Sequence, residues 1–564
     1  MLWWTFSYIM TTLYLKSLIF LTFLNFSLPA LAQDSPVPPQ RTKTRLPEEF
    51  SAHQPTILPV LTSDGKRMYF DRKNYTGDTG GINDFDDIWF SDLLPSGLWT
   101  KAQNVGAPLN TLGSDVLCSL SPDDRTALVY GIYDKELPVK NEGFSLSRFK
   151  NGAWQFPEPI TIRNFYNRTK KYYARLAPDN RTLLLALQRN ESLGGLDLYV
   201  SFREDTALVF SEPLHLGKTL NTANYEGSPH LAADGRTLYF SSEGFGGSGV
   251  ADLFVTRRLD DSWQHWTTPV NLGSSINSSE EDSSIDITLD GKSAYFLSSD
   301  STGKKGLYQS LLPDSLRHTG AVLLHGKAMV DKNLEKNYGK ISWQGLSGNA
   351  RVMVTAYGTV RDSAGNIKPS LIALAETALS MESATQEYAL ALPAGSLYVL
   401  RASVQGNSAI PAWTALVDTR TKEPLERREQ NIIFGSKSLA GLSFSSIRFA
   451  QEQALITPEY RSVLTLLAFA HSALRAEAKT VNVEIIGHTC NLGTNEENNA
   501  LAQERAEAVA TFLESKGVSH ESIKVRSEGE RKPLSRSALE EARAMNRRVE
   551  IRFIVQPASK RAQR

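Results

Sequence analysis

The fold of the last domain is decided by the stretch Glu484-Ile-Ile-Gly-His-Thr-Cys490. Two further motifs follow it in order, Asn498-Asn-Ala-Leu-Ala-Gln-Glu-Arg505 and Asn546-Arg-Arg-Val-Glu-Ile551. Apolar and polar residues alternate before the first motif and through the third, which is typical of strands with one buried face, whereas the second motif lies in a segment of helical periodicity. The three motifs therefore predict a mixed α/β domain.

Capping residues predict the ends of two helices in this domain. Thr457-Pro458 predicts a helix start, with Thr as the cap and Pro at the first helical position. Thr494-Asn-Glu-Glu497 is a capping box that opens a second helix, which Gly517 ends. We expect one apolar stripe on each helix. The stripes are Val463, Leu467, Ala470 and Leu474 on the first, and Leu501, Ala508, Val509 and Phe512 on the second.

Together the three motifs resemble the OmpA-like peptidoglycan-binding domain, over residues from about 443 to 555 of a domain assigned to residues 437–555. In that family an Asp follows Gly-His-Thr, and an Arg follows on the next helix. The resemblance implies that this pair holds the zwitterionic end of a diaminopimelate in a peptidoglycan stem peptide, the Asp on the ammonium and the Arg forked on the carboxylate. The family positions that it implies for peptidoglycan binding are Cys490, Asn498, Arg505 and Arg547.

The chain departs from the family at the Asp position, which is Cys490. A thiol is a weak hydrogen-bond partner and cannot replace a carboxylate that faces an ammonium. Two interpretations stay open: the domain binds peptidoglycan weakly or with an altered stem-peptide preference, or it is an interaction scaffold whose pocket no longer binds. An anion explains Arg505 on an aliphatic helix better than solvation does. The structural alternatives are a hydrogen-bonding role for His488 and a surface charge for Arg547.

Length and composition fit a multidomain protein. A chain of 564 residues exceeds a single core, so three or four domains are expected. Basic and acidic side chains balance at 61 each, which argues against a broad nucleic-acid-binding surface. The two cysteines, Cys118 and Cys490, fall in different predicted domains, so we expect no disulfide. Cys118, in an apolar run, is expected to be buried in a strand.

Residues 1–32 are predicted to be a secretory signal peptide. Lys16 precedes an apolar run from Leu18 to Leu28, and Ala30-Leu-Ala32 is a small-residue cleavage site. A retained membrane anchor is the alternative, and the absence of a cysteine at the cleavage point argues against a lipoprotein. Residues 33–47 are read as a linker because they begin with a Pro-rich segment. No later run is long and apolar enough to span a bilayer as a helix.

Residues 48–313 repeat a unit of a strand, an Asp-Gly-like turn and a second strand. Most units add an aromatic strand, such as Asp197-Leu-Tyr-Val200, and a fourth element with Trp or Phe before Pro. Four short strands per repeat predict an all-β propeller, and the pattern resembles TolB-like and WD40-like repeats. Five blades are visible, and a sixth, completed from the ends of the region, stays open. The aligned turn aspartates are Asp64, Asp123, Asp179, Asp234 and Asp290.

These repeated aspartates could be calcium ligands or turn formers. Asp, Asn and Gly adopt the positive φ that tight hairpins need, and the spacing does not match a calcium loop, so the sequence favours turn formers and predicts no metal and no cofactor. A hydrolase is also disfavoured, because Gly345-Leu-Ser-Gly348 is not a Gly-x-Ser-x-Gly elbow and too few residues follow it. The propeller is therefore expected to bind an unknown envelope protein.

Residues 318–425 resemble the small β-sandwich of carboxypeptidase regulatory domains. Residues 350–356 alternate with period two, and residues 388–400 read as a hairpin-like segment. We expect a spacer or contact module in which His325 is structural. The charged stretch Thr419–Gln430 is read as a linker to the last domain.

The sequence therefore predicts a multidomain protein with an all-β propeller, a small β-sandwich and a C-terminal α/β domain. It is expected to be a non-catalytic periplasmic protein that ties an envelope assembly to peptidoglycan, with any outer-membrane association made through a partner. The alternative function is that of an interaction scaffold with an inactive pocket. Neither interpretation involves nucleic acid.

Overall fold

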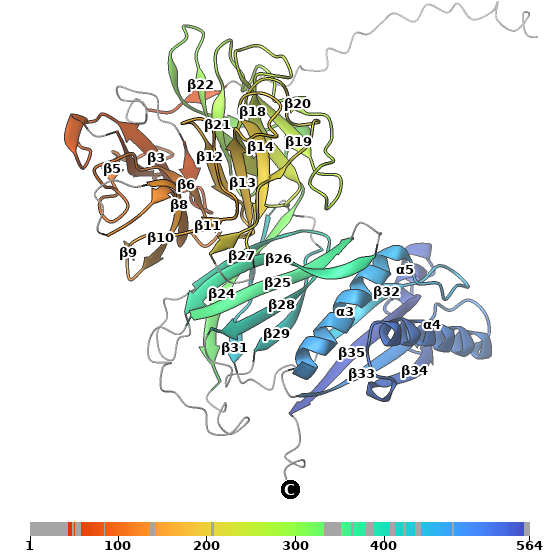
Figure 1. Cartoon of the computed structure of the whole chain (residues 1–564). Coiled ribbons are helices and arrows are strands. Elements are labelled where there is room, and N and C mark those ends of the chain that lie inside the picture. Colours follow the sequence, from red (N-terminus) through yellow and green to blue (C-terminus); the bar gives the residue numbers. More distant parts are fainter. Residues whose placement is uncertain are drawn as a thin grey trace, which may run out of the picture. The chain divides into compact units, whose positions relative to one another are not determined.

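A computed structural model describes most of the chain after residue 42. The described residues are 43–47, 50, 58–83, 85–135, 141–204, 208–331, 351–361, 366–378, 387–405, 412–420, 423, 425–434, 442–476 and 479–557. The predicted signal peptide and most of the linker lie outside them. Strands make up nearly all regular structure before residue 448, and helices and strands alternate after it (Figure 1). No helix in the described part of the chain is long and apolar enough to cross a membrane.

Five antiparallel sheets follow one another through the first 311 residues. The first contains β2 (Val60–Leu61), β3 (Arg67–Lys73), β4 (Asp86–Asp92) and β5 (Gln103–Asn104), and the second β6 (Leu117–Leu120), β7 (Thr126–Ile132), β8 (Asn141–Lys150), β9 (Ala153–Trp154) and β10 (Glu158–Pro159). The third contains β12 (Tyr173–Leu176), β13 (Thr182–Leu187), β14 (Asp197–Phe202) and β16 (Leu214–His215), and the fourth β17 (Glu226–Leu231), β18 (Thr237–Ser242), β19 (Asp252–Arg257) and β20 (Val270–Asn271). The fifth contains β21 (Ser283–Ile287), β22 (Ser293–Ser299), β23 (Lys305–Leu311) and β1 (Thr44–Arg45). A short parallel pair, β11 (Thr161–Ile162) with β15 (Val209–Phe210), links the second and third repeats.

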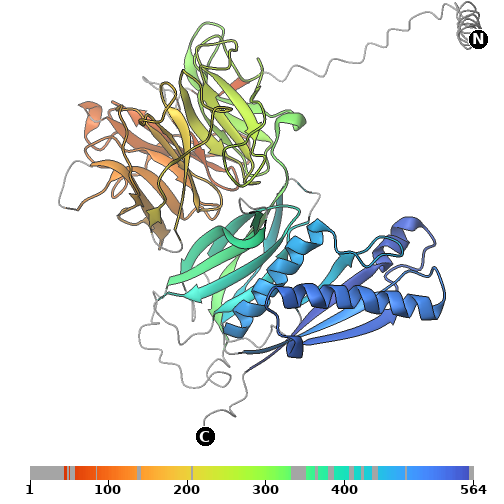
Figure 2. The same cartoon turned by 45° about the vertical axis from the view of Figure 1, so that its right-hand side comes forward.

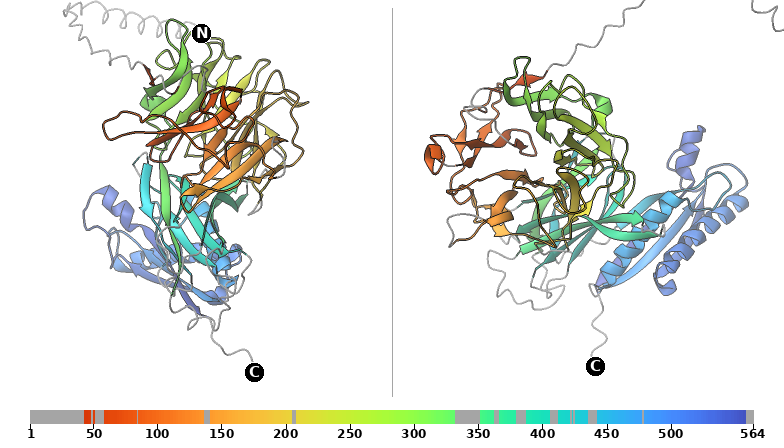
Figure 3. Two further views of the ribbon diagram at one scale, coloured as in Figure 1. Left: turned by 90° about the vertical axis from the view of Figure 1, so that its left-hand side faces the viewer. Right: turned by 45° about the horizontal axis from the view of Figure 1, so that its top comes forward.

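The first strands of these sheets contact one another in turn: β2 with β6, β6 with β12, β12 with β17, β17 with β21, and β21 with β2. The sheets follow one another around this common centre (Figure 3, right). There, Arg175 Nη2 donates to Asp286 Oδ1 over 2.6 Å, and Leu61 N donates to Asp286 Oδ2 over 2.7 Å. Both side chains are buried. One carboxylate therefore ties together the first strands of three sheets.

The fifth sheet is completed by the first strand of the chain. β1 pairs antiparallel with β23, with Thr44 opposite Gln309. Lys43 Nζ donates to Ser298 Oγ over 2.5 Å and to Ile276 O over 3.2 Å, which fixes the start of the strand. The sequence left open a sixth repeat built from the ends of the region. In the structure, β1 instead supplies a strand to the fifth sheet.

A second all-β region follows, with two facing sheets that share one apolar core. One sheet contains β27 (Glu387–Pro393), β24 (Ala321–Val330), β30 (Leu425–Glu429) and β31 (Ile432–Phe434). The other contains β26 (Ile367–Ala378), β25 (Arg351–Arg361), β28 (Leu397–Val404) and β29 (Trp413–Asp418). Residues such as Leu324, Val354 and Leu390 fill the core between them.

The linker predicted over Thr419–Gln430 is wrong for residues 425–429. β30 lies within this stretch and pairs in parallel with β24, with Leu425 opposite Ala321. The strand stands at the edge of its sheet, where charged side chains such as Arg427 remain exposed to solvent. Charge in this stretch therefore marks an edge strand and not a connection between domains.

The C-terminal domain is a four-stranded sheet with two long helices on one face (Figure 2). The sheet order is β32 (Leu442–Arg448), β35 (Arg548–Pro557), β33 (Lys479–His488) and β34 (Ile523–Gly529). The helices are α3 (Pro458–Ala476) and α4 (Asn495–Ser515), and the short α5 (Glu540–Asn546) precedes β35. The predicted alternation is confirmed, since Val483, Ile485, Val549 and Ile551 are all buried in one core.

Helix α3 buries two faces and not the single stripe that the sequence predicts. Leu467 and Leu474 lie in the domain core as expected. The helix also contacts β25, β26, β28 and β29, and the rings of Phe469 and Tyr357 lie 5.0 Å apart. The C-terminal domain is therefore packed directly against the β-sandwich.

Candidate functional site

The candidate site forms where β33 ends and α4 begins. β33 ends at His488, and Thr489 and Cys490 follow it in the loop before the helix. A Cβ atom at Gly487 would lie 1.8 Å from the backbone oxygen of Ala502 in α4. Only a glycine permits this close approach of helix and strand, which accounts for the Gly of the Gly-His-Thr motif.

Arg505 lies inside the domain and not on its surface. Its side chain is fully buried, and burial lowers the pKa of its guanidinium to about 10. The group donates from Nε to Gln453 O over 2.8 Å, from Nη2 to Ala450 O over 2.9 Å and from Nη1 to His488 O over 3.2 Å. Arg505 thus fastens the segment after β32 to the end of β33, and these bonds engage all three guanidinium nitrogens.

Arg547 is buried as well, at 6% exposure, so the alternative of a surface charge is wrong. Nη2 forms an ion pair with Glu540 Oε1 at 2.6 Å, and Nε donates to Phe449 O over 3.3 Å. Nη1 has no hydrogen-bond partner among the described residues. Burial lowers the pKa of Arg547, but contacts with Glu540 and Cys490 outweigh burial and the net pKa is raised.

Cys490 lies close to both of these cations. The side chain is 5% exposed and interacts electrostatically with both Arg505 and Arg547. Thr489, at 2% exposure, donates its backbone N–H to Gly529 O, while its Oγ1 lacks a hydrogen-bond partner in the described part of the chain. The result is a buried corner with two guanidinium groups, unsatisfied donors and a thiol where the family has a carboxylate.

Asn498 reaches the site from the first turn of α4. It is 3% exposed, and its Nδ2 donates to Glu530 Oε2 over 2.9 Å. The capping box predicted for this helix is present, because Thr494 accepts from Glu497 N and Glu497 accepts from Thr494 N. The box sets where α4 begins, and therefore where Asn498 and Arg505 lie.

The surroundings of His488 differ from the hydrogen-bonding environment that the sequence predicts. The ring is 2% exposed, and neither ring nitrogen has a hydrogen-bond partner among the residues that the structure describes. Burial, helped by Arg548, lowers the pKa of His488 to about 4, although Glu550 lies 3.4 Å from Nε2. The imidazole is therefore neutral at neutral pH. Its ring is buried without the hydrogen bond that the sequence suggested.

The structure brings together Cys490, Arg505 and Arg547, and it places Asn498 beside Glu530. Sequence reasoning missed the roles of Thr489 and Glu540. Thr489 belongs to the Gly-His-Thr motif, so its position was available as a signal. Glu540 lies seven residues before Arg547 on a short helix, and nothing in the sequence pairs the two.

The repeated aspartates of the five sheets form turns, as predicted. In each repeat the carboxylate accepts the backbone N–H two residues later, for example Lys66 N on Asp64 Oδ1 at 3.0 Å and Arg236 N on Asp234 Oδ1 at 2.9 Å. Within the described ranges, no group of three or more His, Cys, Asp or Glu side chains could hold a metal ion.

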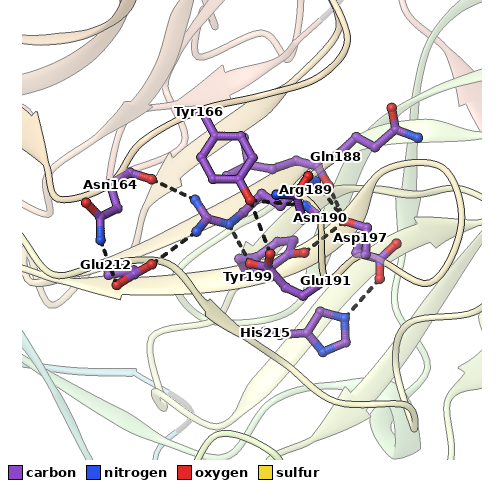
Figure 4. A network of polar contacts seen from close by, with 12 residues as sticks. Asn164, Tyr166, Gln188, Arg189, Asn190, Glu191, Asp197, Tyr199, Glu212 and His215 are labelled. Atoms are coloured by element: carbon purple, nitrogen blue, oxygen red, sulfur yellow. Dashed lines mark hydrogen bonds and ion pairs between the residues drawn. The ribbon is translucent and has the colours of Figure 1, made fainter.

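A network of polar contacts surrounds Arg189 in the loops of the third sheet (Figure 4). The Arg189 guanidinium lies over the Tyr166 ring at 4.3 Å and pairs with Glu191 at 2.5 Å and Glu212 at 3.2 Å. Its Nη1 donates to Asn164 O. These bonds use all three guanidinium nitrogens, so the network joins neighbouring loops and presents no free donor nitrogen to a ligand.

A cavity of about 870 Å³ lies between the turns of the third and fourth sheets, the β-sandwich and α3. Its charges pair largely within its own lining, as Arg420 does with Asp418 and Arg258 with Asp261. The cavity is a polar crevice between packed regions. We therefore place the candidate site at Cys490.

Comparison with known proteins finds relatives of the C-terminal domain. A model of the OmpA family matches residues 448–547, a span that includes Cys490, Asn498, Arg505 and Arg547. The chain is 34% identical over 122 residues to the peptidoglycan-associated lipoprotein of Haemophilus influenzae, covering 21% of this chain and 77% of that protein. Among solved structures, the peptidoglycan-associated lipoprotein from Burkholderia pseudomallei is 29% identical, with a TM-score of 0.18, and the match covers 20% of this chain and 91% of that one.

Several other relatives are matched over only part of their length. The chain is 34% identical over 105 residues to outer membrane porin F of Pseudomonas fluorescens, covering 18% of this chain and 31% of that protein. It covers 47% of the probable lipoprotein YiaD of Escherichia coli. The chain thus spans less than two thirds of these relatives. Through the domain that carries Cys490, Arg505 and Arg547, the chain belongs to the OmpA family.

Proposed function

We propose that this protein is a non-catalytic component of the cell envelope that binds peptidoglycan through its C-terminal domain. The observation that carries the proposal is the buried corner at Cys490, where the Nη1 of Arg547 lacks an acceptor among the described residues. A buried cationic donor without an acceptor is unfavourable, so a carboxylate from a stem peptide would stabilise it. Relatives named as peptidoglycan-associated lipoproteins support this choice of ligand.

The five sheets are proposed to form a β-propeller that binds a second envelope protein. The mutual contacts of the five first strands and the closure of the last sheet by β1 support this architecture. The β-sandwich would act as the module that joins the propeller to the peptidoglycan-binding domain. Periplasmic localisation, with association to the outer membrane through the partner, follows from the same proposal.

The test is co-sedimentation of the full chain with purified peptidoglycan sacculi. We expect the native protein to sediment and Arg547→Met to lose most of this binding, because the change removes the buried cation and keeps an aliphatic stem. Arg531→Met, which alters an arginine whose side chain is 56% exposed in the same domain, is the control and should sediment as the native protein does.

A second candidate function is an interaction scaffold without peptidoglycan binding, and the thiol at Cys490 is the observation that favours it. Native protein that fails to sediment, together with sedimentation gained in Cys490→Asp, would establish this alternative. Absence of sedimentation in both would remove peptidoglycan as the ligand. Arg505→Ala is a poor test, because its guanidinium also binds three backbone carbonyls that hold the domain together.

A further inference from the structure

Two buried side-chain donors close to Cys490 have no acceptor among the described residues. Arg547 Nη1 and Thr489 Oγ1 both lack hydrogen-bond partners in the described part of the chain, although these residues are only 6% and 2% exposed. Thr489 adjoins Cys490 in the sequence, and the Arg547 side chain interacts with the Cys490 side chain. Buried polar groups in native proteins are nearly always paired, so these donors indicate a place that a ligand acceptor would occupy.

The charges around this corner favour an anion and disfavour a cation. Arg505 and Arg547 both present guanidinium groups, and Cys490 supplies no carboxylate. The nearby carboxylates are already engaged, Glu540 by Arg547 at 2.6 Å and Glu530 by Asn498 at 2.9 Å. An ammonium placed here would lose its hydration and meet two positive charges without a carboxylate of its own.

An acylated amine differs from a free amine in its charge. Its amide nitrogen is uncharged and carries one N–H donor, for which a thiol sulfur is an adequate, weak acceptor. The adjoining carboxylate would keep its charge and could accept from Arg547 Nη1 and Thr489 Oγ1. In peptidoglycan, acylation of the diaminopimelate side-chain amine is the covalent result of a cross-link between two stem peptides.

We propose that Cys490 makes this pocket select a diaminopimelate carboxylate whose neighbouring amine is acylated, as in a cross-linked stem peptide, over one whose amine is a free ammonium. This inference rests on the proposed binding of peptidoglycan and narrows its ligand. Cys490 acts as the specificity-determining residue. Arg547 and Thr489 bind the carboxylate.

The experiment compares two soluble probes by titration calorimetry with the full chain. One is a tripeptide that ends in diaminopimelate with a free side-chain amine, and the other is the same peptide with that amine acetylated. We expect native protein to bind the acetylated probe about tenfold more tightly, because the free ammonium would lose its hydration beside two guanidinium groups and find no carboxylate. Cys490→Asp should reverse the order, and Cys490→Ser, which keeps a small uncharged group, should preserve it.

Several results would overturn the inference. The inference fails if native protein binds the free-amine probe as tightly as the acetylated probe, or more tightly. If Glu530→Gln then loses binding of the free-amine probe, Glu530 has replaced the family carboxylate. Sedimentation with sacculi without binding of either probe would refute the selectivity and leave peptidoglycan binding intact. If native protein neither sediments nor binds a probe, the proposed function itself fails. Hydrogen exchange of α4 should be unchanged in each variant, which separates a lost contact from a lost fold.

Discussion

At the scale of single residues, His488 makes the stability of the C-terminal domain depend on pH. Its ring is held neutral in the folded domain, with a pKa of about 4 against an ordinary value of 6.5, mainly because burial disfavours the imidazolium. Arg548 and Arg526 disfavour the imidazolium further, while Glu550 and Glu528 act in the opposite direction. Protonation therefore occurs more readily in the unfolded chain than in the folded domain.

We expect the C-terminal domain to lose stability as the pH falls from about 6.5 toward 4, the interval in which the unfolded chain binds a proton that the folded domain does not. His488→Gln, which cannot titrate, should show a shallower loss across the same interval. Hydrogen exchange of β33 and α4, followed by mass spectrometry at pH 7.5 and pH 5, would measure it. Equal slopes for native protein and variant would contradict this prediction.

The positions of the site residues could be predicted from the sequence, but their surroundings could not. The motif places Arg505 on α4 near Cys490, as the structure has it. The carbonyls that surround its guanidinium come from Ala450 and Gln453, more than fifty residues earlier in the chain. Burial of Arg547 likewise depends on Phe449. Residue type and spacing do not predict contacts with partners so distant in the sequence.

At the scale of elements, the capping box of α4 sets the geometry of the site. Thr494 Oγ1 accepts from Glu497 N over 3.2 Å, and Glu497 Oε2 accepts from Thr494 N over 2.8 Å. The first turn of α4 carries Asn498, and Arg505 follows two turns later on the buried side. Loss of the cap should therefore loosen the site as well as the helix.

We expect Thr494→Ala to destabilise the domain by about 1 kcal/mol, the usual effect of removing a helix N-cap side chain. Thr494→Ser keeps the hydroxyl and should stay close to native. Exchange rates of the backbone amides in the first turn of α4 would report the loss. Native protection in Thr494→Ala would mean that tertiary packing alone fixes this turn.

The starts of α3 and α4 were predicted from their capping residues, whereas α5 was not predicted and the buried faces were predicted only in part. α3 begins at Pro458 as its capping residues indicate, but it packs against both the sheet and the sandwich, so its second apolar face had no expected partner. On α4, Val509 lies in the core, while Leu501 is only partly buried and Ala502, Ala506 and Leu513 are fully buried. The real stripe is rotated slightly because Gly487 lets the helix approach β33 at Ala502.

At the scale of the whole molecule, Glu376 joins the β-sandwich to the first all-β region. From β26 it pairs with Arg148 Nη2 at 2.8 Å and Arg203 Nη2 at 2.9 Å, and all three side chains are at least nine-tenths buried. Burial raises the pKa of Glu376, but Arg148 and Arg203 outweigh burial and hold it below its ordinary value. The carboxylate is therefore ionised, and it compensates two buried cations.

We expect Glu376→Ala to destabilise the protein by about 3 kcal/mol, because it removes the carboxylate from a buried ion-pair network with Arg148 and Arg203. Glu387→Ala is the control: Glu387 lies in the same sandwich, is 52% exposed and stands 3.7 Å from Lys327. Its effect should stay within about 0.5 kcal/mol. Denaturant unfolding would measure both, and similar small effects for the two variants would contradict the role given to Glu376.

The pairing of β1 with β23 has a consequence for how the chain is made. Arg45 donates to the carbonyl of Lys305, a partner 260 residues away, so the strand synthesised first waits for almost half of the chain before it can pair. Until then β1 has no partner strand and is exposed to other chains, and the β23 edge of the fifth sheet that β1 closes is not yet formed. The five-sheet region therefore cannot fold completely before β23 is synthesised, whatever the order in which the other sheets fold. Cleavage after residue 46 would leave that edge permanently open, whereas cleavage before residue 43 would preserve its closure.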